Sequence, residues 1–177
     1  CCDESNVRIS EDFSVIYGLP DEAIIDKTNS DSVDLVVMST TGKDGLLQKI
    51  IGSVSRNVAI YGKTPVILIP ENVTYRCPRH ILYATNHHPD EIEGLKQLVK
   101  FAKQFNAFIH IVHVDTTSSS TEQVREHLES KVFKNGIKNI DYKITTVYAN
   151  DVLTGLNDYI LDNEIDIVAI TTIHRPF

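Results

Sequence analysis

The pattern of apolar and polar positions along the chain predicts two kinds of element, strands and helices. The run DLVVM (Asp34 to Met38) is continuously apolar, which is typical of a strand covered on both faces. The stretch from Asp90 to Phe105 carries an apolar stripe at helical spacing, formed by Ile92, Leu95, Leu98, Val99 and Ala102. Strands that alternate with helices of this length predict right-handed βαβ units and a parallel sheet. The predicted fold class is therefore α/β.

The same patterns place the remaining elements. We predict strands at 13–18, 34–38, 65–70, 80–85, 107–114, 142–148 and 166–170. We predict helices that begin near Pro20, Ser53, Asp90, Glu122 and Asp151. Gly62 should stop the second helix, and the run PVILIP (Pro65 to Pro70) should form another buried strand.

An internal repeat relates the two halves of the chain. Without a gap, residues 15–40 lie over 147–172, so that SDSVDLVVMST matches DNEIDIVAITT. A repeat of this length corresponds to about one domain and is far longer than the period of a solenoid. The chain therefore holds parts of two related domains.

The domain boundaries follow from this repeat. We assign residues 1–72 to the C-terminal part of a first domain, 73–78 to a linker, and 79–177 to the N-terminal part of a second domain. Because each copy is incompletely represented, we expect either a fragment or a longer protein whose other segments are missing from this sequence.

A glycine-rich loop directly follows the first buried strand. It contains Gly42, Gly45 and Gly52, and the last glycine precedes Ser53, where a helix should begin. Glycines let a backbone adopt positive φ and approach a polyphosphate closely, and the first N–H groups of a helix favour an anion. Glycine-rich turns are also common after strands, and a Gly-Ser helix start can simply be a cap. Both interpretations stay open on the residues alone.

These residues resemble the universal stress protein family in its tandem-domain form. The family's nucleotide motif, G-x2-G-x9-G-[S/T], follows the fourth strand of a five-stranded parallel sheet. Gly42, nine residues, Gly52 and Ser53 reproduce the second half of this motif, and Ser39 occupies the place of the first glycine. The resemblance implies parallel-sheet, Rossmann-like domains of the adenine nucleotide alpha hydrolase-like type.

The resemblance also implies a ligand and a role. The ligand would be ATP or a related adenine nucleotide, carried with Mg²⁺, in a protein of stress response and regulation rather than fast catalysis. The cofactor-binding residues that it assigns are Met38, Ser39, Gly42, Gly52, Ser53 and Val54. The alternative is a scaffold that binds no nucleotide and uses the same fold for partner binding or for a homodimer, or a pseudo-dimer of the tandem domains, through the strand at 65–70.

The second domain departs from the family motif. Asn86 stands where nucleotide-binding members carry aspartate, and Thr171 and His174 stand at the first two glycine positions. A β-branched side chain and an imidazole would crowd a phosphate loop. We therefore predict that this second site is degenerate and does not bind ATP.

The sequence gives little support for a metal site or a catalytic site. His110 and His113 are three residues apart on a predicted strand, so they should point to opposite faces and share no metal ion. The chain has neither a G-x-S-x-G elbow nor a G-x4-G-K-[ST] loop. We assign no catalytic residue, no metal ligand and no enzymatic activity.

Composition and charge narrow the possible partners and location. The net charge is -7, which argues against a surface that binds nucleic acid. No apolar run approaches the roughly 20 residues of a membrane helix, and the first residues lack a signal-peptide core. The only cysteines, Cys1, Cys2 and Cys77, form no metal-like pair, so we expect a reducing compartment and a cytoplasmic protein.

Overall fold

The structure, a computed structural model, describes residues 10–40, 52–71, 73–88, 90–117 and 140–172. The chain divides into two compact units at the step from Tyr75 to Arg76. Among the described residues, we call 10–75 the N-terminal unit and 76–172 the C-terminal unit, and we describe each by itself. The point of division lies inside the linker that the sequence predicts.

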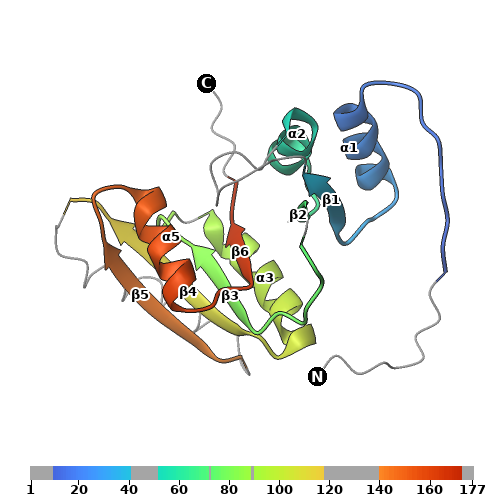
Figure 1. The fold of residues 1–177 in the computed structure, drawn as a ribbon. Coiled ribbons are helices and arrows are strands. Elements are labelled where there is room, and N and C mark those ends of the chain that lie inside the picture. The colour runs from blue at the N-terminus through green and yellow to red at the C-terminus, as the bar shows by residue number, and fades with distance from the viewer. Residues whose placement is uncertain (1–9, 41–51, 72, 89, 118–139, 173–177) are drawn as a thin grey trace. The chain divides into compact units, whose positions relative to one another are not determined.

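The N-terminal unit is built from two strands and two helices: α1 (Pro20–Ser30), β1 (Val36–Thr40), α2 (Ser53–Tyr61) and β2 (Val66–Pro70). The strands pair in parallel, with Val36 opposite Val66, as Figure 1 shows. α1 packs against α2, and α2 packs against both strands. Proline suits the first position of α1 because its missing N–H would have no partner there.

Gly62 ends α2, as the sequence predicts. Its N–H donates to the carbonyl of Val58 at 2.9 Å. A Cβ atom at this position would lie 2.5 Å from the same carbonyl oxygen, closer than the backbone tolerates. The glycine therefore lets the chain turn away from the helix toward β2.

The strand predicted at 13–18 is wrong. These residues form no strand, and Phe13 and Tyr17 are 93% and 96% exposed. The alternating apolar pattern fits a strand, but no described strand lies beside it to complete its hydrogen bonds. The segment therefore has the apolar pattern of a strand but lacks a neighbouring strand with which to pair.

The prediction that β1 and β2 are covered on both faces is also wrong. Val37 in β1 is 57% exposed and Ile69 in β2 is 39% exposed. Both residues lie on the face opposite to that of Met38, Thr40 and Leu68, since side chains alternate along a strand. The described helices therefore cover only one face of this sheet.

The C-terminal unit is a four-stranded parallel sheet with the order β5-β4-β3-β6. Its elements are β3 (His80–Ala84), α3 (Glu91–Phe105), β4 (Phe108–Asp115), β5 (Tyr142–Tyr148), α5 (Val152–Asp162) and β6 (Ile167–Ile170). Figure 1 shows the strands side by side. The fold class predicted from the sequence, a parallel-sheet α/β fold, is confirmed. The helix predicted from about Glu122 lies outside the described residues.

The two faces of this sheet are buried under different helices. Ile81, Tyr83, Ile109 and Ile111 form one core with the apolar stripe of α3, to which Leu95, Val99 and Ala102 contribute. On the other face, α5 packs against β4 and β5. The continuous apolar runs of β3 and β4 thus follow from burial on both sides.

The positions of α1 and α5 agree with the internal repeat. Each helix has 11 residues, and Val152 at the start of α5 is 132 positions after Pro20 at the start of α1. This is the same spacing by which residues 15–40 lie over 147–172. Among the described helices, none combines the length and the apolar character needed to cross a bilayer.

Candidate functional site

The carboxyl end of β1 holds the first residues of the predicted site. Met38 is half-buried, Ser39 is exposed, and Thr40 is 3% exposed. Because side chains alternate along the strand, Ser39 points to the face opposite to that of Met38 and Thr40. Gly42, the next predicted residue, lies outside the described residues.

Thr40 is a residue that the sequence analysis missed as a site candidate. Its hydroxyl is buried and has no hydrogen-bond partner in the part of the chain that the structure describes. A buried hydroxyl without a partner costs about 1–3 kcal/mol, so such groups are rare and call for an explanation. The feature of the sequence that could have identified it is a residue with a hydroxyl group at the end of a buried strand, directly before a glycine loop.

The N-terminus of α2 holds the rest of the predicted site. Gly52 is the N-cap residue, and because it has no side chain it makes no capping hydrogen bond. The hydroxyl of Ser53 is exposed and makes no capping bond, which removes the capping interpretation left open by the sequence. The first amide groups of α2 are therefore left without a side-chain acceptor.

The conformation of Gly52 corrects one expectation. Its φ is -65° and its ψ is 162°, an extended conformation that any residue adopts. A Cβ atom here would meet only the hydroxyl of Ser55, at 3.8 Å. Neither positive φ nor the packing of the described residues requires a glycine at this position.

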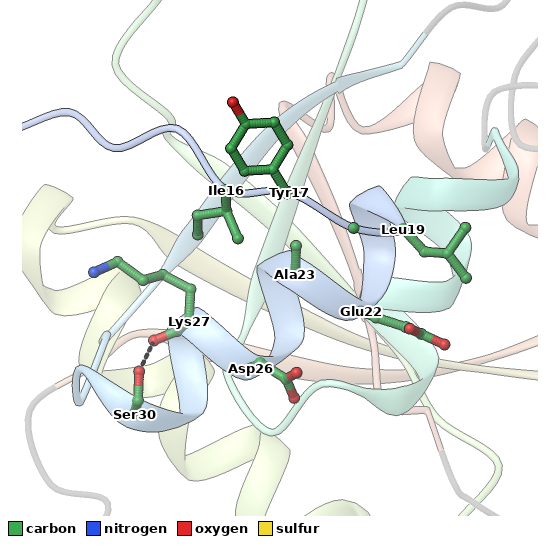
Figure 2. A pocket seen from close by; sticks show the side chains of 9 residues that line it. Ile16, Tyr17, Leu19, Glu22, Ala23, Asp26, Lys27 and Ser30 are labelled. Atoms are coloured by element: carbon green, nitrogen blue, oxygen red, sulfur yellow. Dashed lines mark hydrogen bonds between the residues drawn. The ribbon is translucent and has the colours of Figure 1, made fainter.

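A shallow, open groove lies elsewhere in the N-terminal unit, between the extended segment before α1 and α1 itself, with a volume of about 360 Å³. Figure 2 shows its lining, which includes Ile16, Leu19 and Ala23 together with the carboxylates of Glu22 and Asp26. The hydroxyl of Ser30 donates to the carbonyl of Lys27 at its rim. Two carboxylates against the single ammonium group of Lys27 leave the lining with a net negative charge, which is unfavourable for a polyphosphate.

In the C-terminal unit, the corresponding end of the sheet is filled by protein groups. The carboxylate of Glu91, only 7% exposed, accepts hydrogen bonds from the N–H of Asn86 at 3.0 Å and from the hydroxyl of Thr85 at 2.5 Å. The hydroxyls of Thr171 and Tyr83 lie 2.7 Å apart. Burial raises the pKa of Tyr83 to about 12, against the effect of Thr171 and together with that of Glu91. His174, the other predicted departure from the motif, lies outside the described residues.

The histidines lie in two separate places. The Nδ1 atom of His110 lies 3.1 Å from the hydroxyl of Tyr159, and its Nε2 atom lies 3.1 Å from His80 Nδ1. His113 instead directs Nδ1 to the carbonyl of Thr85, at 3.0 Å. The pKa of His110 is lowered to about 4, mainly by burial and in addition by the nearby charges of Lys143 and His80. Within the described ranges, no cluster of three or more potential metal ligands occurs.

Comparison with known proteins finds a family to which part of the chain is similar. The model of the universal stress protein family matches residues 3–70, which include β1, the glycine loop, α2 and β2. This segment is therefore similar to the universal stress protein family. The similarity rests on the stretch for which the sequence showed the family's glycine–serine spacing, and the tandem arrangement of two such domains stays a prediction.

Individual proteins are also similar to this chain. Universal stress protein MJ0577 of Methanocaldococcus jannaschii is 31% identical over 55 residues, which are 31% of this chain and 34% of that protein. The match thus spans about a third of the length of this curated relative. A universal stress protein of Archaeoglobus fulgidus has 18% identity and a TM-score of 0.64, over 85% of this chain and 55% of its own, and this likeness shows the fold. Protein Rv1636 of Mycobacterium tuberculosis has a TM-score of 0.47 at 8% identity, over 59% of this chain and 79% of its own.

The cysteines complicate the predicted location. Cys77 is disulfide-bonded, whereas the sparse cysteines led us to expect a reducing compartment. A cytoplasmic location therefore stays a prediction.

Proposed function

We propose that the N-terminal unit binds ATP or a related adenine nucleotide between the end of β1 and the start of α2. The protein would act in stress response as a regulatory nucleotide-binding protein. The observation that carries this proposal is Gly52, a glycine at the N-terminus of α2 that neither its own conformation nor the packing of the described residues requires. A glycine without a conformational or packing reason is explained by a ligand that approaches its backbone closely.

The start of α2 supplies suitable groups for phosphate oxygens. Helix N-termini carry a partial positive charge and N–H groups that point away from the helix. Here the amides of Ser53 and Val54 are the first of α2, and the exposed hydroxyl of Ser53 can donate a further hydrogen bond. Mg²⁺ would enter with the nucleotide and neutralise part of the phosphate charge.

Thr40 provides independent support. Its buried hydroxyl has no partner among the described residues and lies at the last position of β1, where α/β folds bind ligands. A movement of the adjoining chain upon binding would give this hydroxyl an acceptor. Ser39 replaces the family's first glycine. Its side chain lies on the other face of the sheet, so it does not obstruct a ligand on the side of Thr40.

The C-terminal unit is proposed not to bind a nucleotide. The amide of Asn86, at the end of β3, already donates to the buried carboxylate of Glu91. A negative charge at this point would also repel a phosphate group. The side chain of Thr171 lies against Tyr83, which further fills this end of the sheet.

Calorimetric titration of the full chain with ATP, with and without Mg²⁺, tests the proposal. We expect saturable binding that Gly52→Val abolishes, because its branched side chain would occupy the path to the helix amides. Thr40→Val should weaken binding roughly 5- to 10-fold through the loss of one hydrogen bond. Thr145→Val, a matched change in β5 of the C-terminal unit, should leave binding unchanged. Absence of saturable heat at about millimolar ATP would reject the proposal.

The exposed position of Ile69 favours a second candidate function, that of a scaffold which pairs through β2. Ile69 is 39% exposed, and β2 is hydrogen-bonded to a described strand on one side only. An open apolar edge of this kind can pair with another chain. Ile69→Lys should then reduce the mass measured by size-exclusion chromatography with light scattering. An unchanged mass argues against this contact.

A further inference from the structure

The outer edge of β5 is open among the described strands and has none of the features that usually protect such an edge. β5 lies at one end of its sheet (Figure 1), and its seven residues pair with β4 without a bulge, from Tyr142 to Tyr148. The strand contains no proline and one charged residue, Lys143. Edge strands in natural proteins are usually short, bulged or charged, because an unprotected edge can pair with another chain.

Lys143 does not protect this edge, because its side chain is directed to α5. Its ammonium group donates to the Oδ1 atom of Asn163 at 2.9 Å and lies 5.4 Å from the centre of the Tyr159 ring. Tyr159 belongs to α5, and Asn163 is the residue that caps its C-terminus. The positive charge is therefore held over one face of the sheet and not at its edge.

The open edge does not depend on the part of the second domain that this sequence lacks. At the spacing of the internal repeat, β1 lies over β6. Because β2 pairs with β1 in the N-terminal unit, the repeat predicts that an equivalent strand of the C-terminal unit would pair with β6. β5 and β6 lie at opposite ends of the sheet, so such a strand would leave the edge of β5 open.

The backbone groups of β5 alternate between β4 and the outer edge. The carbonyl of Asp141 and the N–H of Ala149 both make hydrogen bonds to β4. The odd-numbered residues of β5 therefore direct their backbone groups to β4. Since successive residues of a strand direct these groups to opposite sides, the N–H and C=O groups of Ile144 and Thr146 point to the outer edge.

The two exposed tyrosines of β5 lie on one face, at the two ends of the strand. Ile144 packs against the core cluster on the α3 face, and the alternation of side chains places Tyr142 and Tyr148 on this same face. Tyr142 is 38% exposed and Tyr148 is 61% exposed. An antiparallel copy of the strand would bring each tyrosine beside the other, and aromatic pairs of this kind stabilise neighbouring strands.

We propose that β5 pairs with β5 of a second copy of this chain, in an antiparallel register centred on Thr145. This register uses all seven residues of the strand and joins the outward backbone groups of Ile144 to those of Thr146 in the other copy. Two-fold symmetry uses each edge once, so the assembly stops at a dimer. Because a single strand pair is a small interface beside the standard of roughly 800 Å² per partner, we expect a reversible dimer with a Kd of about 10–100 μM.

Charge pairing at the ends of the strand tests this register. The chains compared carry Ile69→Lys, which removes pairing through β2, and their masses are followed by sedimentation equilibrium. Tyr142→Glu with Tyr148→Lys places opposite charges beside each other across the two copies, whereas Tyr142→Glu with Tyr148→Glu places like charges there. We expect the first variant to dimerise at least about 10-fold more tightly than the second. The two variants are matched, because each removes the same two tyrosines.

Cysteine crosslinking locates the two-fold axis. In the proposed register Thr145 lies opposite itself, with the two Cα atoms about 4.5 Å apart, which is within the range of a disulfide. Thr145→Cys should therefore form disulfide-linked dimers when glutathione disulfide is added as the oxidant. Lys143→Cys is the control, because its two copies would lie opposite Val147 and not opposite each other. Peptide mapping distinguishes the new bond from bonds of the chain's own cysteines.

Three results would overturn the proposal: no self-association of the Ile69→Lys chain up to about 0.5 mM, equal dimer constants for the two charge variants, or crosslinking through residue 143 as efficient as through residue 145. A dimer of the unchanged protein that Ile69→Lys abolishes would support pairing through β2 instead and would count against pairing through β5.

Discussion

The carboxylate of Glu91, at the first position of α3, accepts the backbone N–H of Asn86 at 3.0 Å. Its second oxygen accepts the hydroxyl of Thr85 at 2.5 Å. A single buried side chain thus satisfies two donors where β3 gives way to the loop before α3.

Replacement of this carboxylate tests its importance for the fold. Glu91→Ala leaves the N–H of Asn86 and the hydroxyl of Thr85 without an acceptor, so we expect a loss of about 2 kcal/mol in the free energy of unfolding. Urea denaturation measures the change. The control is Glu93→Ala, because Glu93 makes only an exposed ion pair with Lys96, at 3.1 Å, and should change stability by less than about 0.5 kcal/mol. Equal effects of the two variants would contradict the assigned role.

Asp166 joins the start of β3 to the chain before β6. One of its carboxylate oxygens accepts the N–H groups of Arg79 and His80, at 2.8 and 3.0 Å. Burial opposes its ionisation, but these bonds and the charge of Arg76 outweigh that effect and lower the pKa of Asp166. We expect Asp166→Ala to cost roughly 1–3 kcal/mol at neutral pH by thermal or urea unfolding. If Arg76→Ala, which removes only the exposed ion pair, costs as much, the backbone bonds are not the main contribution.

The contact between Gly94 and Thr171 predicts whether a substitution of Gly94 stabilises or destabilises the protein. Helix propensity alone would make Gly94→Ala stabilising by about 1 kcal/mol. Because the new methyl group collides with the Thr171 hydroxyl, we expect destabilisation instead, by about 1–3 kcal/mol. In a double-mutant cycle, Thr171→Ala should recover at least about 1 kcal/mol of this loss. Strict additivity of the two changes would show that the residues do not touch.

His110 makes the stability of the C-terminal unit depend on pH. Its pKa is lowered to about 4 by burial, whereas the unfolded chain has the ordinary value of 6.5. Between these values the unfolded state binds a proton that the folded state does not, so stability should fall as pH decreases from 6.5 to about 4. Thermal unfolding at several pH values should show a shallower decline for His110→Gln than for the unchanged protein. The control His88→Gln, at a partly exposed loop residue, should keep the original slope.

Most of the fold follows from local patterns in the sequence. The limits of α3 and β5 agree with their apolar periodicity, and Pro20 and Gly62 mark the start of α1 and the end of α2 as expected. The strand expected at 13–18 failed because periodicity does not report whether a partner strand is present. The prediction that β1 is buried on both faces failed for a related reason, because an apolar run does not show whether both faces of a strand are covered.

The site was predictable only in part. The spacing of Gly52 and Ser53 led to the start of α2, but the unpartnered hydroxyl of Thr40 depends on tertiary packing that no local pattern encodes. The role of Glu91 also depends on tertiary packing. From the sequence, its acidic side chain at a helix start suggested only a favourable interaction with the helix dipole. Its burial and its two bonds become visible when β3 and α3 are brought together.

The extended stretch before α1 has a practical consequence for work with this protein. Phe13 and Tyr17 are almost fully solvent-exposed on backbone that belongs to no helix or strand. Chymotrypsin cleaves after such aromatic residues when the chain can enter its active-site cleft in an extended form. Brief digestion should therefore cleave the polypeptide after these residues, and purification will benefit from inhibitors of that protease class.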